Sequence, residues 1–328
     1  MISSIKRLTS AIMITLMILG SIIVLDACTS PKNEAFSGES KATEAPETAE
    51  APVPAEDEPA ADSNSPSCRI VTIGGTSGGS YHGLAYDYSS DRSAKEDESR
   101  TGETRTVEFA GKEYDIVYKE TASFVIGDYT VDRYGIVTDD SGTAQSGTDV
   151  SLLPDGTLGS IWVFDGSLAQ ITPKDNMTHE EMLAAVADVL KDEVDFSRFE
   201  YSKVFDPDPE NAQPDYTLVW YNETNGLEHD DSIGILMDVD GNICRVLVKN
   251  RMVLGLDEAP ELKLDDYLPA IEAKLSEIYG EVKSYSFRST MLTVIEGSPC
   301  IFCKGDVEFA YNGETETDLF QFAVIPEN

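Results

Sequence analysis

The residues that most resemble a catalytic motif lie in the stretch TIGGTSGGSYHG, which begins at Thr72. Within it, GTSGG at residues 75–79 fits the G-x-S-x-G pattern of a hydrolase nucleophile, with Ser77 at its centre. A short apolar run, IVTI at residues 70–73, precedes the motif, and His82 follows the serine by five residues. These residue types could perform acyl transfer if the rest of the chain positioned them.

The order of the chain argues against that chemistry. An α/β-hydrolase needs alternating strands and helices around its serine, but SYHGLAYDYSSDRSAKEDES, after Gly79, has no apolar helical face. In the trypsin-like order a histidine precedes the serine, and no histidine precedes Ser77. The Gly-Lys-Ser/Thr ending of a phosphate loop is also missing. We therefore predict no catalytic residue and interpret residues 74–80, all glycine or serine except Thr76, as a flexible loop that opens the folded region.

The histidines form no metal-binding pattern. His179 lies in the first turn of a predicted helix, where a surface position is usual. His229 lies in LEHDDS between Glu228 and the pair Asp230-Asp231, and these side chains could hold a metal ion. Because a metal site needs ligands that converge, we interpret this segment as a solvated connection between strands.

Residues 238–242, DVDGN, begin like a calcium-binding loop. Such a loop requires glutamate at its twelfth position, and counting from Asp238 that position is Lys249. We predict instead a hairpin turn, in which Asp-Gly supplies the backbone geometry. The sequence therefore predicts neither a metal nor a cofactor.

Cys300 and Cys303 form a lone C-x-x-C within apparent strand sequence. Residues three apart on a strand point to opposite faces, so we expect two half-buried cysteines. A strained local disulfide, or a bridge between Cys68 and Cys244, is the alternative. Four thiols allow three pairings, and the sequence does not choose between them.

The N-terminus has the form of an export signal. Lys6 and Arg7 precede residues 11–25, which carry no charge and are too short to span a bilayer. The run ends in LDACTS, and this order resembles a bacterial lipoprotein signal. The resemblance implies that Cys28 receives a diacylglyceryl group and becomes the first mature residue. Asp26 departs from the usual small neutral residue. An ordinary secretory signal cut near Ala27, or an uncleaved anchor, is the alternative.

A linker is predicted over residues 28–66. Residues 29–66 hold six prolines, eight alanines and nine acidic residues, with Phe36 and Val53 as the large apolar side chains. Such a composition buries too little surface to offset the entropy of ordering. The formal charge of −36 becomes −37 once residues 1–27, with a net charge of +1, are removed. So acidic a surface excludes nucleic acid and anionic lipid headgroups as ligands.

The first part of the folded region, residues 67–172, is predicted to be rich in β-strands. TRTVEFAGKEYDIVYK, residues 104–119, alternates around a turn at Ala110-Gly111, which is a hairpin signal. A Pro-Asp-Gly turn at residues 154–156 precedes a strand through residues 161–164. We interpret the charged residues 89–104 as a loop.

Two helices are predicted further on. Thr178 and Glu181 form a capping box, followed at helical spacing by Met182, Leu183, Val186, Val189 and Leu190. A second helix starts near Asp266, with Pro269 in its first turn, and stops at Gly280. Strands follow each helix. The pairs Tyr221-Asn222 and Tyr311-Asn312, ninety residues apart, suggest a repeat. We therefore expect an α+β fold, with antiparallel sheets each packed by one helix and a β-rich N-terminal part. The aromatics Trp162, Trp220, Tyr221 and Phe302 are expected in the core.

A helix followed by strands ending in ILMDVDGNICRVLV resembles the PepSY domain, whose last hairpin has an Asp-x-x-Gly turn between apolar strands. The resemblance covers residues 173–328 and implies two units, 173–255 and 256–328, the second without a final strand. Paired units behind a lipoprotein signal look like surface lipoproteins of Gram-positive bacteria, Firmicutes in particular. PepSY domains are implicated in inhibiting or modulating extracytoplasmic enzymes, so the resemblance implies a protein partner outside the cytoplasm.

These features predict a non-enzymatic lipoprotein that is anchored to the cell membrane through Cys28 and faces the extracytoplasmic side. We expect it to bind or modulate a protein partner at the cell surface. An extracytoplasmic ligand- or cation-binding lipoprotein is the alternative.

Overall fold

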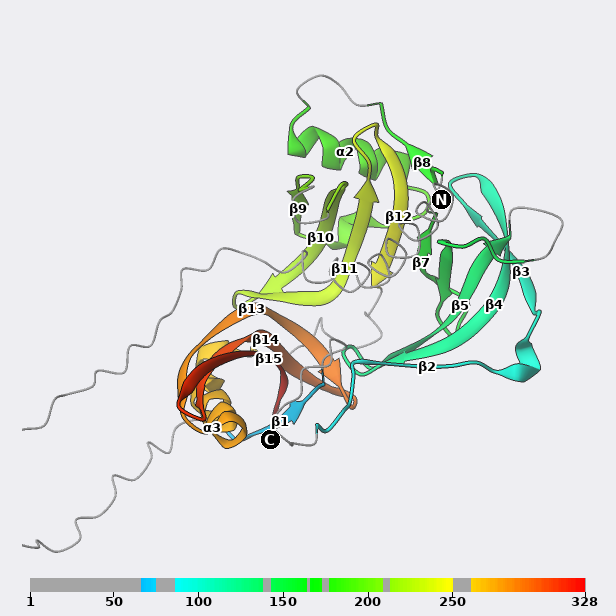
Figure 1. Cartoon of the computed structure of the whole chain (residues 1–328). Coiled ribbons are helices and arrows are strands. Elements are labelled where there is room, and N and C mark those ends of the chain that lie inside the picture. The colour runs from blue at the N-terminus through cyan, green and yellow to red at the C-terminus, as the bar shows by residue number, and fades with distance from the viewer. Residues whose placement is uncertain are drawn as a thin grey trace, which may run out of the picture.

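A computed structural model of the chain describes residues 66–74, 86–137, 143–163, 166–172, 177–208, 213–249 and 261–327. Within these ranges, fifteen strands join in a single mixed sheet, whose main path runs β1-β15-β14-β13-β11-β12-β7-β6-β5-β4-β2 (Figure 1). The strands are β1 (Cys68–Thr72), β2 (Arg92–Lys95), β3 (Thr104–Phe109), β4 (Lys112–Phe124), β5 (Tyr129–Val137), β6 (Asp149–Leu152), β7 (Leu158–Trp162), β8 (Ala169–Gln170), β9 (Tyr201–Phe205), β10 (Tyr216–Thr224), β11 (Leu227–Met237), β12 (Asn242–Lys249), β13 (Val282–Ile295), β14 (Ser298–Tyr311) and β15 (Glu314–Pro326). The helices are α2 (His179–Val189) and α3 (Leu268–Tyr279), with short 3-10 turns η1 (Glu98–Arg100), η2 (Phe196–Arg198) and η6 (Leu264–Tyr267).

The expected α+β class, with separate sheets each packed by one helix, is wrong: the described protein is mostly β and its strands form one large sheet. Two junctions merge the predicted sheets. β12 pairs with β7, placing Val246 opposite Ile161, and β11 runs parallel to β13, placing His229 opposite Leu292. An unpaired strand edge presents open backbone donors and acceptors, and here neighbouring strands use those edges to extend the sheet.

The two helices lie where the sequence places them. Thr178 Oγ1 accepts a hydrogen bond from Glu181 N, and Thr178 N donates to the Glu181 carboxylate, so the capping box is confirmed. α3 has Pro269 in its first turn and is followed by Gly280 at φ 75°. The predicted apolar face of α2 is narrower than expected, because Val189 is 40% exposed.

Both helices cover the same face of the sheet. β11 shows this, because its odd-numbered residues point to one side. Leu227 packs in the cluster that contains Ile271 of α3, whereas Ile233 packs in the cluster that contains Val186 of α2. A third apolar cluster lies on the opposite face of the C-terminal strands and includes Val71, Ile73, Ile295, Cys300, Phe302, Ala323 and Ile325.

Two units of one helix and four consecutive antiparallel strands stand out in the sheet. The first is α2 with β9-β10-β11-β12, and the second is α3 with β13-β14-β15 and then β1. Their second hairpins turn at Asn225-Gly226 and Asn312-Gly313, with φ of 53° and 79° in the first and 52° and 87° in the second. The two matching turns begin at Asn225 and Asn312, 87 residues apart. The predicted spacing of ninety residues compared Tyr221, which lies inside β10, with Tyr311, which is the last residue of β14, and these two positions are not equivalent. The final strand missing from the second unit is supplied by β1.

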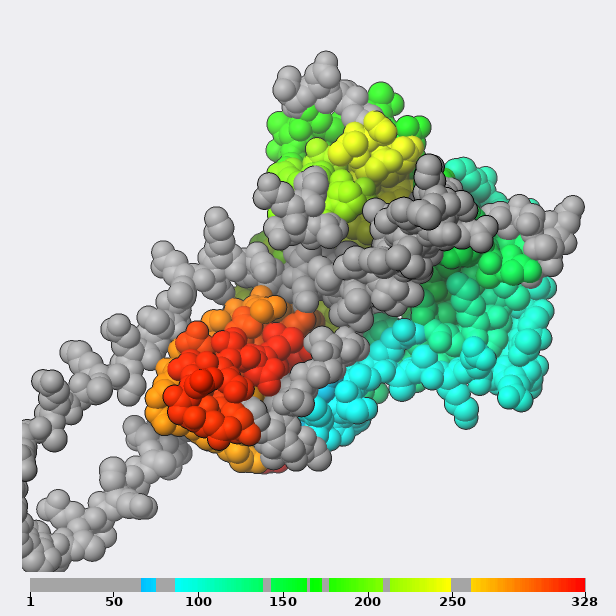
Figure 2. Space-filling model, in the orientation of Figure 1, coloured from blue at the N-terminus to red at the C-terminus, as the bar shows by residue number. Residues whose placement is uncertain are grey.

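The cyan and green surface of the N-terminal segment lies to one side of the orange and red C-terminal segment (Figure 2). We call strands β2 to β7 the N-terminal lobe, and the buried apolar residues of β3 to β7 share one cluster with α2. The predicted hairpin at residues 104–119 is confirmed, with Phe109 opposite Lys112 across Ala110-Gly111. The predicted loop at residues 89–104 instead contains β2 and η1. The turn between β4 and β5 contacts the second unit, because Gly127 N donates a hydrogen bond to Val294 O of β13 at 2.8 Å.

Candidate functional site

The residues that the sequence singled out for catalysis or lipidation, Ser77, His82 and Cys28, lie outside the described residues. The hairpin predicted at residues 238–242 is confirmed, because Asp238 Oδ1 accepts hydrogen bonds from Asp240 N at 2.9 Å and Asn242 N at 2.8 Å. Within the described part of the chain, no group of three or more His, Cys, Asp or Glu could hold a metal ion.

The histidines occupy contrasting positions. His179 Nε2 lies 2.9 Å from Asp206 Oδ1 at the exposed start of α2, in agreement with the predicted surface position. His229 lies inside β11, 2.8 Å from Thr224 Oγ1, so the predicted solvated connection is wrong. The turn, at Asn225-Gly226, directly precedes LEHDDS, which continues into the apolar part of β11.

The acidic residues of LEHDDS are buried at the junction of β11 with β13. Asp230 accepts a hydrogen bond from Thr293 Oγ1 at 3.0 Å, and Asp231 accepts one from Arg198 at 2.8 Å. Adjacent strand residues point to opposite faces, so these two carboxylates do not converge on one point. Burying a carboxylate costs free energy unless the group is paired. We therefore interpret these two contacts as structural, with Asp230 joining β11 to β13 and Asp231 joining β11 to η2.

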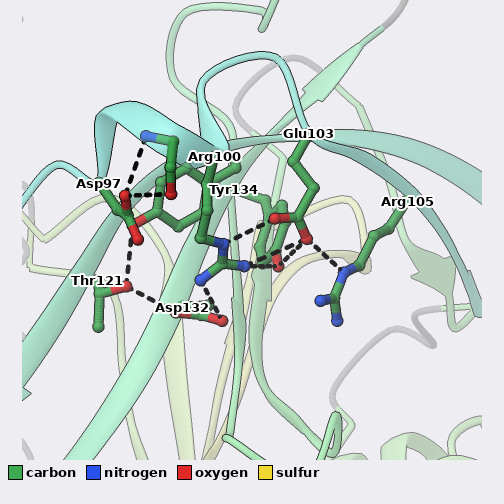
Figure 3. A network of polar contacts seen from close by, with 9 residues as sticks. Asp97, Arg100, Glu103, Arg105, Thr121, Asp132 and Tyr134 are labelled. Carbon is green, nitrogen blue, oxygen red and sulfur yellow. Dashed lines mark hydrogen bonds and ion pairs between the residues drawn. The ribbon is translucent and has the colours of Figure 1, made fainter.

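A second polar cluster surrounds Arg100 of η1 (Figure 3). The guanidinium donates to both carboxylate oxygens of Glu103 at 2.7 and 3.2 Å, to Tyr134 Oη at 2.9 Å, and pairs with Asp132 at 2.9 Å. It also lies 4.1 Å from the ring centre of Tyr118. The hydrogen bond from Arg100, followed by that from Arg105, lowers the pKa of Glu103 from its ordinary 4.5 to about 2. With its donors engaged in this way, Arg100 serves to fix η1 on the core.

A third polar row crosses the N-terminal lobe. Glu120 contacts both Arg92 and Arg133, and Arg133 also donates to Asp149 at 2.7 Å. The four residues come from β2, β4, β5 and β6 and alternate in charge across the sheet. Alternating charges on neighbouring strands stabilise the pairing of those strands, and this row suits that role.

The cysteines are free thiols in the described structure, so neither the bridge between Cys68 and Cys244 nor a local disulfide is present. Cys300 and Cys303 lie in β14 and belong to apolar clusters on opposite faces, as predicted, but both are fully buried rather than half-buried. Burial raises the pKa of both thiols, which disfavours the reactive thiolate.

The aromatic residues divide between core and surface. Trp220 and Phe302 are buried, as predicted. Tyr221 is half-buried on the other face of β10 from Trp220, with its ring 5.6 Å from that of Tyr201 and 4.6 Å from the Lys203 ammonium. Cross-strand aromatic pairs of this kind stabilise a sheet edge.

A further set of contacts surrounds β1. Its backbone pairs with β15 from Cys68 opposite Pro326 to Thr72 opposite Phe322. Asp87 Oδ2 accepts hydrogen bonds from Thr72 N at 2.7 Å and from Thr72 Oγ1 at 2.9 Å. We call the groups that hold β1, namely the edge of β15 with Asp87, Tyr88 and Glu296, the β1 seat.

The outer side of the β1 seat is charged. Glu296 pairs with Arg69 and accepts a hydrogen bond from Tyr88 Oη at 2.7 Å. These two hydrogen bonds, from Tyr88 first and Arg69 second, lower the pKa of Glu296. Sequence reasoning missed Asp87, Tyr88 and Glu296, because none carries a local motif and Glu296 is 227 residues from its partner Arg69.

Comparison with protein families, with curated proteins and with solved structures finds no match to this chain. None of the helices in the described residues is long and apolar enough to cross a membrane.

Proposed function

We propose that this protein is a lipid-anchored lipoprotein on the extracytoplasmic face of the cell membrane, where it binds or modulates another protein without catalysing a reaction. The observation that carries the proposal is the position of β1. Lipoprotein-type sequence ends at Cys28, linker-type sequence follows to residue 66, and the folded sheet begins at Cys68. A linker of this composition separates its ends by about 5–6 Å times the square root of its length, which is tens of Å.

The described part of the chain supports binding rather than catalysis. Its buried acids and its Arg100 cluster are held by protein groups, and burial raises the pKa of its core thiols. The protein instead offers sheet surfaces and strand edges, which recognise extended partners by backbone pairing. The resemblance of residues 173–328 to PepSY modules points the same way, since each helix is followed by an antiparallel meander.

The anchor is tested by Cys28→Ser in cells grown with a labelled fatty acid. We expect the label to be lost and the protein to move from the membrane to the medium, because two acyl chains are what retain it. Cys68→Ser is the matched control and should keep both label and retention. Acylation that persists in Cys28→Ser would disprove the anchor.

The binding role is tested separately by photo-crosslinking on intact cells. A specific protein adduct on the anchored chain supports it. A saturable rise in melting temperature with calcium or zinc, without any protein adduct, would instead favour the cation-binding alternative.

A further inference from the structure

The β1 seat has the construction of a peptide-binding site. The resident segment is extended, pairs with the edge of β15 and has side chains buried on both faces. Val71 and Ile73 enter the cluster with Phe302, while Cys68 and Ile70 pack against the cluster that contains α3. Main-chain pairing with alternate side-chain sites is how proteins recognise an added strand.

Charged and polar groups outside β1 fix its register in the seat. Asp87 engages Thr72 through two hydrogen bonds, and Tyr88 N donates to Thr72 O at 3.2 Å. At the other end, Glu296 pairs with Arg69, and Ser67 Oγ donates to Glu327 at 2.8 Å. A slip of one residue would exchange the two buried faces and break both anchor points. The seat therefore selects the sequence of β1.

β1 is a terminal strand of the sheet, so its release would separate one pair of strands. Among the described strands it lies at one end of the sheet and pairs with β15 alone. In the first unit the equivalent strand, β12, is joined to β11 by a tight turn and pairs with β7 as well. The sequences beside β1, rich in alanine, proline and acid before it and in glycine and serine after it, have the composition of linkers.

We propose that the β1 seat is a strand-acceptor site that takes β1 from a second copy of this chain, so that two copies pair by exchanging their first strands. Each seat then makes the same contacts with the partner's β1 as with its own, and the exchange forms a closed two-fold dimer. The inference rests on the proposed function, because two copies anchored in one membrane have the high local concentration that favours pairing.

The native Cys68 provides a direct test, because it lies opposite Pro326 in the β1–β15 pair. Two soluble chains are prepared, both carrying Cys28→Ser. The donor keeps Cys68 and Pro326, and the acceptor carries Cys68→Ser with Pro326→Cys. No chain in this mixture carries both Cys68 and the cysteine introduced at 326, so a disulfide between them links two chains and marks the donor's β1 beside β15 of the acceptor.

We expect a disulfide-linked dimer when donor and acceptor are refolded together at high concentration and oxidised, and none from the acceptor alone. A chain with both cysteines, oxidised before mixing, has β1 locked in its own seat and should stay monomeric. Size-exclusion chromatography of the chain with only Cys28→Ser provides a second measurement. We expect a dimer after concentrated refolding that Val71→Asp removes.

Monomers in both measurements would overturn the proposal. The outcome is independent of the anchor, because every chain in the test carries Cys28→Ser. Failure of strand exchange with normal acylation of Cys28 would therefore leave the proposed function intact. If strand exchange occurs but Cys28 is not acylated, the lipid anchor is disproved and the strand-acceptor site stands.

Discussion

The two helix-and-meander units differ in the origin of their fourth strand. The first unit takes β12 from the sequence directly after β11, across the turn whose Asp238 accepts two backbone hydrogen bonds. The second unit takes β1 from the opposite end of the described sequence and pairs it with β15. Closing a long loop costs more conformational entropy than closing a short turn, although the cost rises slowly with length. The second unit must therefore recover that cost through specific contacts.

Those contacts are visible at β1. Five backbone positions pair with β15, two apolar side chains enter the cluster with Phe302, and Asp87 and Glu296 hold the strand at its two ends. In the first unit, β12 is held in place by the turn that joins it to β11 and by its pairing with β7. The comparison indicates that the second unit depends on sequence that lies next to the predicted linker, whereas the first does not.

The largest expected effect comes from Val71→Asp. Val71 is 1% exposed, and a carboxylate there has no described cationic side chain in its apolar cluster. We expect the free energy of unfolding to fall by about 3 kcal/mol or more, because an uncompensated charge is buried. Urea denaturation measures the change, and hydrogen exchange should place the loss of protection in β13–β15.

The matched control is Val239→Asp in the β11–β12 turn, where the side chain is 63% exposed. This change should shift the free energy of unfolding by no more than about 0.5 kcal/mol. Equal effects from the two substitutions would show that β1 is no more important to its unit than the turn is to the other.

An intermediate effect on stability is expected when glycine is replaced by alanine in the second unit, and almost none when the same change is made in the first. A Cβ at Gly305 of β14 would lie 2.1 Å from Ser286 O and 2.6 Å from the buried Phe320 ring. Gly305→Ala should therefore lower the free energy of unfolding by about 1–3 kcal/mol, through overpacking. At Gly234 of β11 the nearest atom would be Leu247 Cβ at 3.9 Å, so Gly234→Ala should be neutral or slightly stabilising. Thermal melts of both variants measure the difference, and a harmless Gly305→Ala would mean that the second unit is more loosely packed than the structure shows.

Local sequence patterns predicted the local structure well. The hairpin at Ala110-Gly111, the capping box at Thr178, the helix stop at Gly280 and the turn at residues 238–242 are all present. Each depends on the chemistry of a few adjacent residues, such as a positive φ at glycine or an oxygen that accepts a nearby N–H.

The assembly of these elements was not predictable in the same way. Strand pairing between β12 and β7, between β11 and β13 and between β1 and β15 joins segments far apart in the sequence. Apolar alternation gives the buried face of a strand but not the identity of its neighbour. The charges at residues 89–104 suggested a loop, yet Arg100 of this segment contacts Asp132 and Tyr134, which come into reach only once β5 is in place.

The smallest expected effect concerns this Arg100 cluster, a partly exposed set of charges in the N-terminal lobe, whose buried apolar residues share one cluster with those of α2. The pKa of Glu103 falls from 4.5 to about 2, so its contribution to stability is complete above pH 4.5 and is lost as the pH falls towards 2. Glu103→Gln should lower the free energy of unfolding by about 0.2–1 kcal/mol at neutral pH, as expected for partly exposed ion pairs. The difference between the two proteins should shrink below pH 4.5 and vanish near pH 2. Urea denaturation between pH 2 and 7 measures it, with Glu98→Gln in the adjacent η1 as the control. A difference that persists unchanged at pH 2 would mean that Glu103 acts by packing, and the contrast between this charged cluster and the apolar contacts of Val71 would not stand.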